Sequence, residues 1–301
     1  MKMKISPFHP FRSLQAQKEY HAYYMERSRV WPVKSETRSI ETPSGQTFVR
    51  ISGESASPSL VLLPGSLATS LSWIPNIATL SHRHKTYALD SIYDFGLSVR
   101  WRKIKNREDI IAWLNEVLTA LIPTGTFNLM GLSYGGWVAS QYALCHPERL
   151  HKLVLLAPAM TVLPVSFSLI FRALLTRLPF GEFYRWFYYW LLQDAVRSGS
   201  SGQAFVDEAI VDWRTAERCF SPMPIIPATV LSDKAWQSFQ IPVLFMVGEN
   251  EKMYPAQKAA SHLNRVAPRI ETEVISRAGH DLTFTQAELV NGRILEFLGH
   301  R

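Results

Sequence analysis

The stretch that decides the fold is Phe127-Asn128-Leu129-Met130 followed by Gly131-Leu132-Ser133-Tyr134-Gly135-Gly136. The first four residues form a short, mostly apolar run typical of a buried strand, and residues 135–146 have the pattern of a helix. The sequence Gly-x-Ser-x-Gly between a strand and a helix is typical of a tight turn that carries a nucleophilic serine. The sequence therefore predicts that the Ser133 hydroxyl projects above the carboxyl edge of a sheet, where open α/β sheets build their sites.

Similar apolar runs recur on both sides of this turn and alternate with helical patterns. Continuous apolar runs suit strands that are buried on both faces, and strand–helix alternation favours a parallel sheet with helices on both faces. The expected strands are residues 38–42, 46–52, 60–63, 85–89, 127–130, 153–156, 243–247 and 272–275. The expected helices are residues 14–28, 71–80, 107–121, 135–146, 254–266 and 286–298. The fold class is therefore α/β, with a mostly parallel central sheet.

One interval, from about residue 160 to residue 240, shows no clear strand pattern. It is rich in aromatic residues and has helical spacing, so we expect a helical cap inserted between two strands of the sheet. The chain then divides into four parts. These are an N-terminal extension (1–35), the first part of the core (36–159), the cap (160–240) and the second part of the core (241–301).

Composition limits the possible classes of protein. The chain has 301 residues, of which 47% are hydrophobic and 19% charged, as expected for a folded globular protein. The net charge of +7 is scattered. The densest basic stretch, residues 100–107, reads as the solvated start of a helix or loop, and no nucleic-acid motif accompanies it. We therefore expect no nucleic-acid partner.

Targeting signals are not evident in the sequence. The N-terminus lacks the apolar segment of a secretory signal, and no apolar run reaches the length of about 18 residues that a membrane span needs. Two distant cysteines give no disulfide framework; Cys145 is expected to be buried on the helix after Ser133, and Cys219 receives no role. The default expectation is a cytoplasmic protein without an integral membrane segment.

A serine nucleophile needs a base, and nine histidines compete for that role. His280 lies just past the last expected strand, in Arg277-Ala278-Gly279-His280-Asp281, so we expect it on the same edge as Ser133. The other eight have no comparable context. His82-x-His84 lacks a third ligand nearby, so no metal site is expected.

The base also needs an acid that fixes its tautomer. Glu251 lies three residues beyond Gly248, after the strand 243–247, and gives the chain order serine, acid, histidine that this architecture uses. Glu249 remains an alternative. Asp281 is adjacent to His280, and adjacent side chains on an extended segment point apart.

Two other places for the acid are less favourable. The loop at residues 157–160 carries no carboxylate. Asp90 ends a different strand and is expected to cap the turn that follows.

Two backbone amides are expected to hold the oxyanion of the reaction. The Tyr134 N–H lies at the start of a helix, and the Ser66 N–H lies in the loop after the strand at residues 60–63. Pro64 has no N–H and is excluded. Each such donor is typically worth about 3 kcal/mol at the transition state.

With these residues in place, the chain resembles the α/β-hydrolase superfamily, and within it the bacterial carboxylesterases of the naproxen-esterase type. The resemblance runs from about residue 31 to residue 298. It is carried by Trp31-Pro32-Val33, residues 48–52, Leu62-Leu63-Pro64-Gly65, Trp73-Ile74-Pro75-Asn76-Ile77-Ala78, residues 131–136, Gly248-Glu249-Asn250-Glu251 and Ala278-Gly279-His280. The resemblance implies an α/β-hydrolase fold and a carboxylesterase with a triad of Ser133, Glu251 and His280.

Most of the superfamily has Asp at the acid position, and Glu251 is typical of the branch that this chain resembles. The sequence departs from the family at one point: the usual His-Gly of the oxyanion loop is Pro64-Gly65 here. A stiffer loop or a different preferred acyl group would follow. Tyr134, directly after the nucleophile, would narrow the pocket.

The expected cap carries a dense aromatic cluster at residues 183–190, most of which would pack against the core. Trp186 and Trp190 are the candidates for contact with substrate, which would favour an apolar ester; an apolar lid would alternatively touch a membrane surface. We predict a serine hydrolase that cleaves carboxylic esters through an acyl-enzyme intermediate, without a cofactor or metal. The alternatives are thioester, lactone or carbon–carbon bond hydrolysis on the same triad, or a ligand-binding protein without turnover.

Overall fold

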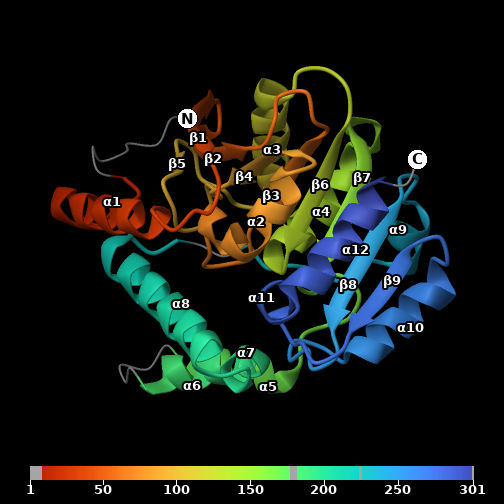
Figure 1. Ribbon diagram of the computed structural model, residues 1–301. Coiled ribbons are helices and arrows are strands. Elements are labelled where there is room, and N and C mark those ends of the chain that lie inside the picture. Colours follow the sequence, from red (N-terminus) through yellow and green to blue (C-terminus); the bar gives the residue numbers. More distant parts are fainter. Residues whose placement is uncertain (1–8, 177–181, 224–225, 300–301) are drawn as a thin grey trace.

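A mostly parallel sheet forms the centre of the molecule in the computed structural model, which describes residues 9–176, 182–223 and 226–299 (Figure 1). Within the described residues the strands follow the order β1-β2-β4-β3-β6-β7-β8-β9, and β5 pairs with β2. Strands β3, β4 and β6 to β9 pair with one another in parallel, whereas β2 pairs antiparallel with β1, β4 and β5 at one side. Their bounds are β1 Ser35–Thr42, β2 Gly45–Ser52, β3 Ser59–Leu63, β4 Lys85–Leu89, β5 Val99–Arg100, β6 Phe127–Leu132, β7 Leu150–Leu156, β8 Val243–Gly248 and β9 Glu271–Ile275.

The central strands are buried on both faces, which explains their continuous apolar sequences. Successive side chains of a strand point to opposite faces of the sheet. In β3, Val61 and Leu63 therefore join the core on one face, and Leu60 and Leu62 join the core on the other. The predicted α/β class with a mostly parallel sheet is confirmed.

Helices cover both faces of the sheet. Helices α3 (Arg107–Leu121), α4 (Tyr134–Cys145) and α10 (Ala256–Val266) pack on the first core, and α2 (Ile74–Ser81) and α12 (Ala287–Gly299) pack on the second. Short helices η1 (Ser70–Trp73), η2 (Pro147–Arg149) and α11 (Leu282–Thr285) lie in the connections between these elements.

A helical segment lies between β7 and β8, as the aromatic, strand-free interval predicts. It contains α5 (Phe167–Leu175), α6 (Glu182–Leu191), α7 (Gln193–Arg197), α8 (Ser200–Cys219) and α9 (Asp233–Gln237). Helices α5 to α8 lie below the sheet in Figure 1, and the N-terminal helix α1 (Leu14–Ser28) lies beside α8. The exact division of the chain at residues 35, 159 and 240 stays a prediction.

Two details differ from the sequence expectation. Cys145 is exposed, because α4 is buried along residues 134–143 and only its last turn reaches the surface. Arg100 is not solvated: it lies in the two-residue strand β5, opposite Gly45, and is only 9% exposed. A strand of two residues is too short to leave a recognisable pattern of alternation.

Candidate active site

Ser133 lies at the turn between β6 and α4, in a backbone conformation that few residues adopt. Its φ of 52° and ψ of −120° fall in the positive-φ region, which costs energy for a residue with a side chain. The surrounding backbone holds this turn: the Ser133 N–H donates to the Leu156 carbonyl at 2.9 Å, and the Ser133 carbonyl accepts from Gly136 and Ala159. A strained conformation that the surrounding hydrogen bonds hold in place is typical of a functional position.

Two glycines allow this tight turn. A Cβ on Gly135 would lie 2.3 Å from the Pro64 carbonyl oxygen, and a Cβ on Gly131 would lie 2.2 Å from the carbonyl oxygen of Gly135. Both distances are far below a van der Waals contact, so only glycine fits. The start of α4 is thereby packed directly against the loop that follows β3.

His280 and Glu251 come from two different loops at the carboxyl ends of β9 and β8. The His280 Nδ1 atom lies 2.9 Å from Glu251 Oε2, and the Glu251 side chain is fully buried. The second carboxylate oxygen, Oε1, accepts the backbone N–H groups of Lys252 and Met253 at 2.8 and 2.9 Å. These two donors fix the orientation of the carboxylate, so Oε2 alone faces the imidazole.

The electrostatic environment of His280 favours its protonated form. Burial by itself lowers the pKa of His280, but the charge of Glu251, its hydrogen bond and a contribution from Asp281 outweigh burial, so the pKa is raised. A raised pKa makes the imidazole a better proton acceptor. The bond at Nδ1 also leaves Nε2 as the nitrogen that could accept a proton from a hydroxyl group.

The loop after β3 approaches the nucleophile from the other side. A Cβ on Gly65 would lie 3.3 Å from Ser133 Cβ, so the Gly65 backbone is in contact distance of the serine. Within the described residues, the N–H groups of Ser66 and Tyr134 have no protein acceptor. Both amides therefore remain candidates for binding an oxyanion.

Asp94 holds this loop in place, which the sequence did not indicate. Its Oδ2 atom accepts the Leu67 N–H at 2.7 Å, and the Ser66 hydroxyl lies 3.5 Å away. Leu67 has a positive φ of 62°, so this hydrogen bond stabilises a strained residue. Burial raises the pKa of Asp94 to about 6, although the Leu67, Phe95 and Ser66 donors act in the opposite direction.

The other carboxylates considered for the role of the acid have hydrogen-bond partners other than the His280 imidazole. Glu249 is exposed, and its carboxylate accepts the backbone N–H of Arg277 at 3.3 Å. Asp281 accepts the N–H groups of Ala195 and Gly279. Asp90 does more than cap a turn, since it is fully buried and accepts the N–H groups of both Ser70 and Leu97.

Trp186 and Trp190 lie on α6, where the Arg172 guanidinium packs 3.8 Å from the ring centre of Trp186 and 4.6 Å from that of Trp190. Among the described residues, no ring contact or hydrogen bond joins either tryptophan to Ser133, Glu251 or His280. Their contact with substrate stays a prediction.

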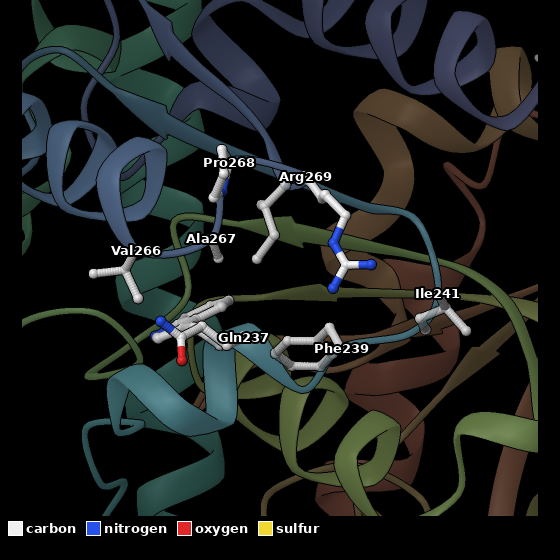
Figure 2. Close-up of a pocket in the computed structure, with 9 residues that line it drawn as sticks. Gln237, Phe239, Ile241, Val266, Ala267, Pro268 and Arg269 are labelled. Atoms are coloured by element: carbon white, nitrogen blue, oxygen red, sulfur yellow. The ribbon is translucent and has the colours of Figure 1, made fainter.

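A cavity of about 220 Å³ lies away from these residues (Figure 2). Its lining comes from the segments before β8 and β9, including Phe239, Ile241 and Arg269, so it lies at the amino edge of the sheet. Figure 2 shows the Arg269 side chain extending along this cavity. The strained serine and the histidine–glutamate pair lie at the opposite, carboxyl edge.

Comparison with known proteins identifies the family of the chain. Residues 60–293 match the model of the alpha/beta hydrolase family. The chain belongs to the alpha/beta hydrolase family, and it is a hydrolase related to bacterial carboxylesterases.

Two curated relatives come from Bacillus subtilis. The chain is 32% identical over 289 residues to carboxylesterase YbfK, which covers 96% of each chain. It is 34% identical over 280 residues to the uncharacterized carboxylesterase nap, which covers 92% of this chain and 91% of the relative. The crystal structure of naproxen esterase from the same organism superposes with a TM-score of 0.83 at 32% identity, covering 95% of this chain and 99% of that one. The predicted resemblance is therefore confirmed.

The described residues contain neither a helix suited to spanning a membrane nor a cluster suited to a metal ion. Across the described residues, no helix is both long and apolar enough to cross a bilayer. The same residues contain no group of three or more His, Cys, Asp or Glu side chains suited to holding a metal ion.

Proposed function

We propose that the chain hydrolyses carboxylic esters through an acyl-enzyme intermediate, with Ser133 as nucleophile, His280 as general base and Glu251 as the acid that orients the base. The observation that carries the proposal is the 2.9 Å contact between His280 Nδ1 and the buried Glu251 carboxylate, on the same sheet edge as the strained Ser133. The carboxylesterases among the relatives support an ester as the substrate class.

The reaction would proceed in two acyl transfers. Ser133 Oγ attacks the ester carbonyl while His280 Nε2 takes its proton, and the N–H groups of Tyr134 and Ser66 bind the oxyanion. The tetrahedral intermediate then expels the alcohol, which receives the proton from His280. Water attacks the acyl-enzyme by the same route and releases the carboxylic acid and free Ser133.

Glu251 would stabilise the imidazolium that forms in each transfer. Its carboxylate accepts a hydrogen bond from the Nδ1–H group, so Nε2 is presented to Ser133 in the required tautomer. The aromatic residues of the cap favour an apolar acyl or alcohol group over a short polar one.

The test compares hydrolysis of p-nitrophenyl acetate and butyrate by the wild type and by Ser133→Ala. The variant should lose about 10⁶-fold in kcat, as is typical for a missing triad nucleophile. Equal activity in both proteins would remove Ser133 from the mechanism. If the wild type instead hydrolysed acyl thioesters or lactones but not these esters, the triad would stand and the substrate class would be wrong.

A further inference from the structure

Helix α7 of the cap touches both loops that carry the proposed acid and base. The contacts are made by two consecutive residues, Asp194 and Ala195. Asp194 binds the loop of Glu251, and Ala195 binds the loop of His280. A single turn of the cap therefore spans the two loops whose separation determines the Glu251–His280 hydrogen bond.

On the acid side, the contact is a side-chain pair. The Asn250 amide nitrogen lies 3.1 Å from both carboxylate oxygens of Asp194, and Asn250 directly precedes Glu251. The Asn250 backbone N–H also donates to the Ala278 carbonyl at 2.9 Å, so this residue already links the acid loop to the base loop. A shift of Asn250 would move Glu251 with it.

On the base side, the contact is between backbone and carboxylate. The Ala195 N–H donates to Asp281 Oδ2 at 2.7 Å, and the other oxygen, Oδ1, accepts the Gly279 N–H at 3.0 Å. Asp281 is only 2% exposed and directly follows His280. The residue before His280 is thereby bound by the carboxylate of the residue after it, and that carboxylate is itself bound by the cap.

The rest of the cap keeps α7 in position. Ala195 is fully buried, and a Cβ on Gly202 of α8 would lie 1.9 Å from its carbonyl oxygen, so the two helices are in direct backbone contact. Phe205 of α8 stacks on Phe284 of α11 with ring centres 4.0 Å apart. The cap therefore contacts the segment beyond His280 at a second point, and α7 is packed against α8 and the two loops.

We propose that Asp194 and Asn250 are positioning residues, through which the cap fixes the distance between Glu251 and His280. This inference rests on the proposed triad. Neither side chain is required to touch the substrate. The cap would then do more than cover the site, since it would complete the geometry of the general base.

The charges around this contact suggest a sharp test. Burial raises the pKa of Asp281, the Ala195 and Gly279 N–H groups lower it, and the charge of Asp194 raises it further. Asp194 and Asp281 are therefore close enough to repel each other. The Asn250 amide donates to Asp194, and backbone N–H groups donate to Asp281, which offsets this repulsion. A second carboxylate at position 250 would remove the donor of Asp194 and add repulsion.

The experiment uses an exchange of the two partners. Asn250→Asp alone places two carboxylates against each other and should lower kcat about ten- to hundredfold with a smaller change in KM, because a small displacement of a catalytic group is costly. The double variant Asp194→Asn/Asn250→Asp restores an amide–carboxylate pair in reverse and should recover kcat to within about threefold of the wild type. Asp212→Asn is the matched control, since it removes a cap carboxylate that binds Tyr23 and Arg27 instead of the catalytic loops.

A second measurement does not depend on turnover. The pKa of His280, followed by NMR titration of its imidazole, should fall in Asn250→Ala, because a displaced Glu251 stabilises the imidazolium less and the substitution changes no charge. An unchanged His280 pKa would overturn the inference even if the protein hydrolysed none of the esters tested. Failure of the double variant to recover kcat, or an equal loss in Asp212→Asn, would also overturn it.

Discussion

The carboxyl edge of the sheet and the outer helices of the cap differ sharply in how their side chains are used. At the edge, Glu251 is fully buried and each of its carboxylate oxygens has a donor or an imidazole partner. On α5 and α6 no described residue is buried, although both helices are rich in apolar side chains. The first region is fixed by hydrogen bonds, and the second exposes the residues that usually form a core.

The exposed apolar residues of α5 follow a helical period. Phe167, Ile170, Phe171 and Leu174 lie at spacings of three and four and form one exposed stripe, with Phe167 82% exposed. At the carboxyl edge of the sheet, by contrast, replacing a single atom of Glu251 changes the hydrogen bonds to His280, Lys252 and Met253. We therefore expect substitutions at the edge to lower kcat strongly while changing the stability of the fold little. Substitutions on the stripe should have little effect on kcat or on stability.

The largest effect should come from Glu251→Gln. Because the Lys252 and Met253 N–H groups bind Oε1, the amide oxygen of glutamine must take that place, which leaves its NH₂ group facing His280 Nδ1. The imidazole would then carry its proton on Nε2, the wrong tautomer for a base. We expect kcat to fall about 10⁴-fold, measured with p-nitrophenyl butyrate.

The control for this variant is its thermal unfolding, which should remain close to that of the wild type, because shape and most hydrogen bonds are kept. Glu249→Gln alters the exposed neighbouring carboxylate and should leave kcat unchanged. If Glu249→Gln caused the greater loss, the acid would be Glu249 and the buried contact would be structural only.

A smaller loss is expected from Asp94→Ala, which frees the Leu67 N–H and the Ser66 hydroxyl. Leu67 would no longer be held at its positive φ, so the Ser66 amide would lose its fixed direction. Loss of one well-placed oxyanion donor costs about 10²-fold in kcat, and this variant should approach that value. Leu67→Gly in the same background should recover part of the loss, since glycine adopts positive φ readily. No loss of activity in Asp94→Ala would show that the loop does not depend on this carboxylate.

These two variants also mark the limit of what the sequence could predict. Ser133 directly follows β6, and Glu251 and His280 lie in the loops that follow β8 and β9, so a local pattern was enough to identify them as candidates. Asp94 contacts a residue 27 positions away, and Asp194 contacts one 56 positions away. Nothing in the local sequence of either residue signals its partner, because the pairing is created by how separate loops and the cap meet.

Burial was predictable where the period of a strand decides it, and less so at the end of a helix. Helix α4 is buried on all sides along most of its length, so no amphipathic pattern shows which turn reaches the surface. The sequence therefore predicts a buried Cys145, and this prediction is wrong. The four-residue spacing of Trp186 and Trp190 predicted the helix but not whether the side chains face the core, solvent or substrate.

The pH dependence of activity should show a still smaller effect. The pKa of His280 is raised above its ordinary value of 6.5, so the acid limb of kcat/KM should lie above pH 6.5. Below this pKa the imidazole is protonated and cannot accept the Ser133 proton, so activity falls as the pH decreases. In a variant that loses the Glu251 charge, the residual activity should have its acid limb at lower pH. A limb below pH 6.5 in the wild type would show that burial, not Glu251, dominates the pKa of His280.

The raised pKa of His280 also makes the stability of the fold depend on pH. Because the folded-state pKa of His280 is raised, its contribution to stability is fully present below the unfolded-state pKa and is lost as the pH rises through the folded value. Activity and this contribution therefore change in opposite directions with pH. The free energies of unfolding of the wild type and of His280→Ala, compared at a pH below 6.5 and at a pH well above it, would separate this contribution from those of other groups.

The smallest effect is expected on the exposed stripe of the cap. Phe167→Ser removes a side chain that is 82% exposed, so the free energy of unfolding should change by no more than about 0.5 kcal/mol. The comparison is Phe205→Ser, which removes a ring stacked on Phe284 and should cost about 1 kcal/mol or more. Urea unfolding of the two variants measures both values. If Phe167→Ser proved as destabilising as Phe205→Ser, the stripe would be covered by other protein atoms in solution, and the contrast between the fixed edge and the exposed cap would no longer hold.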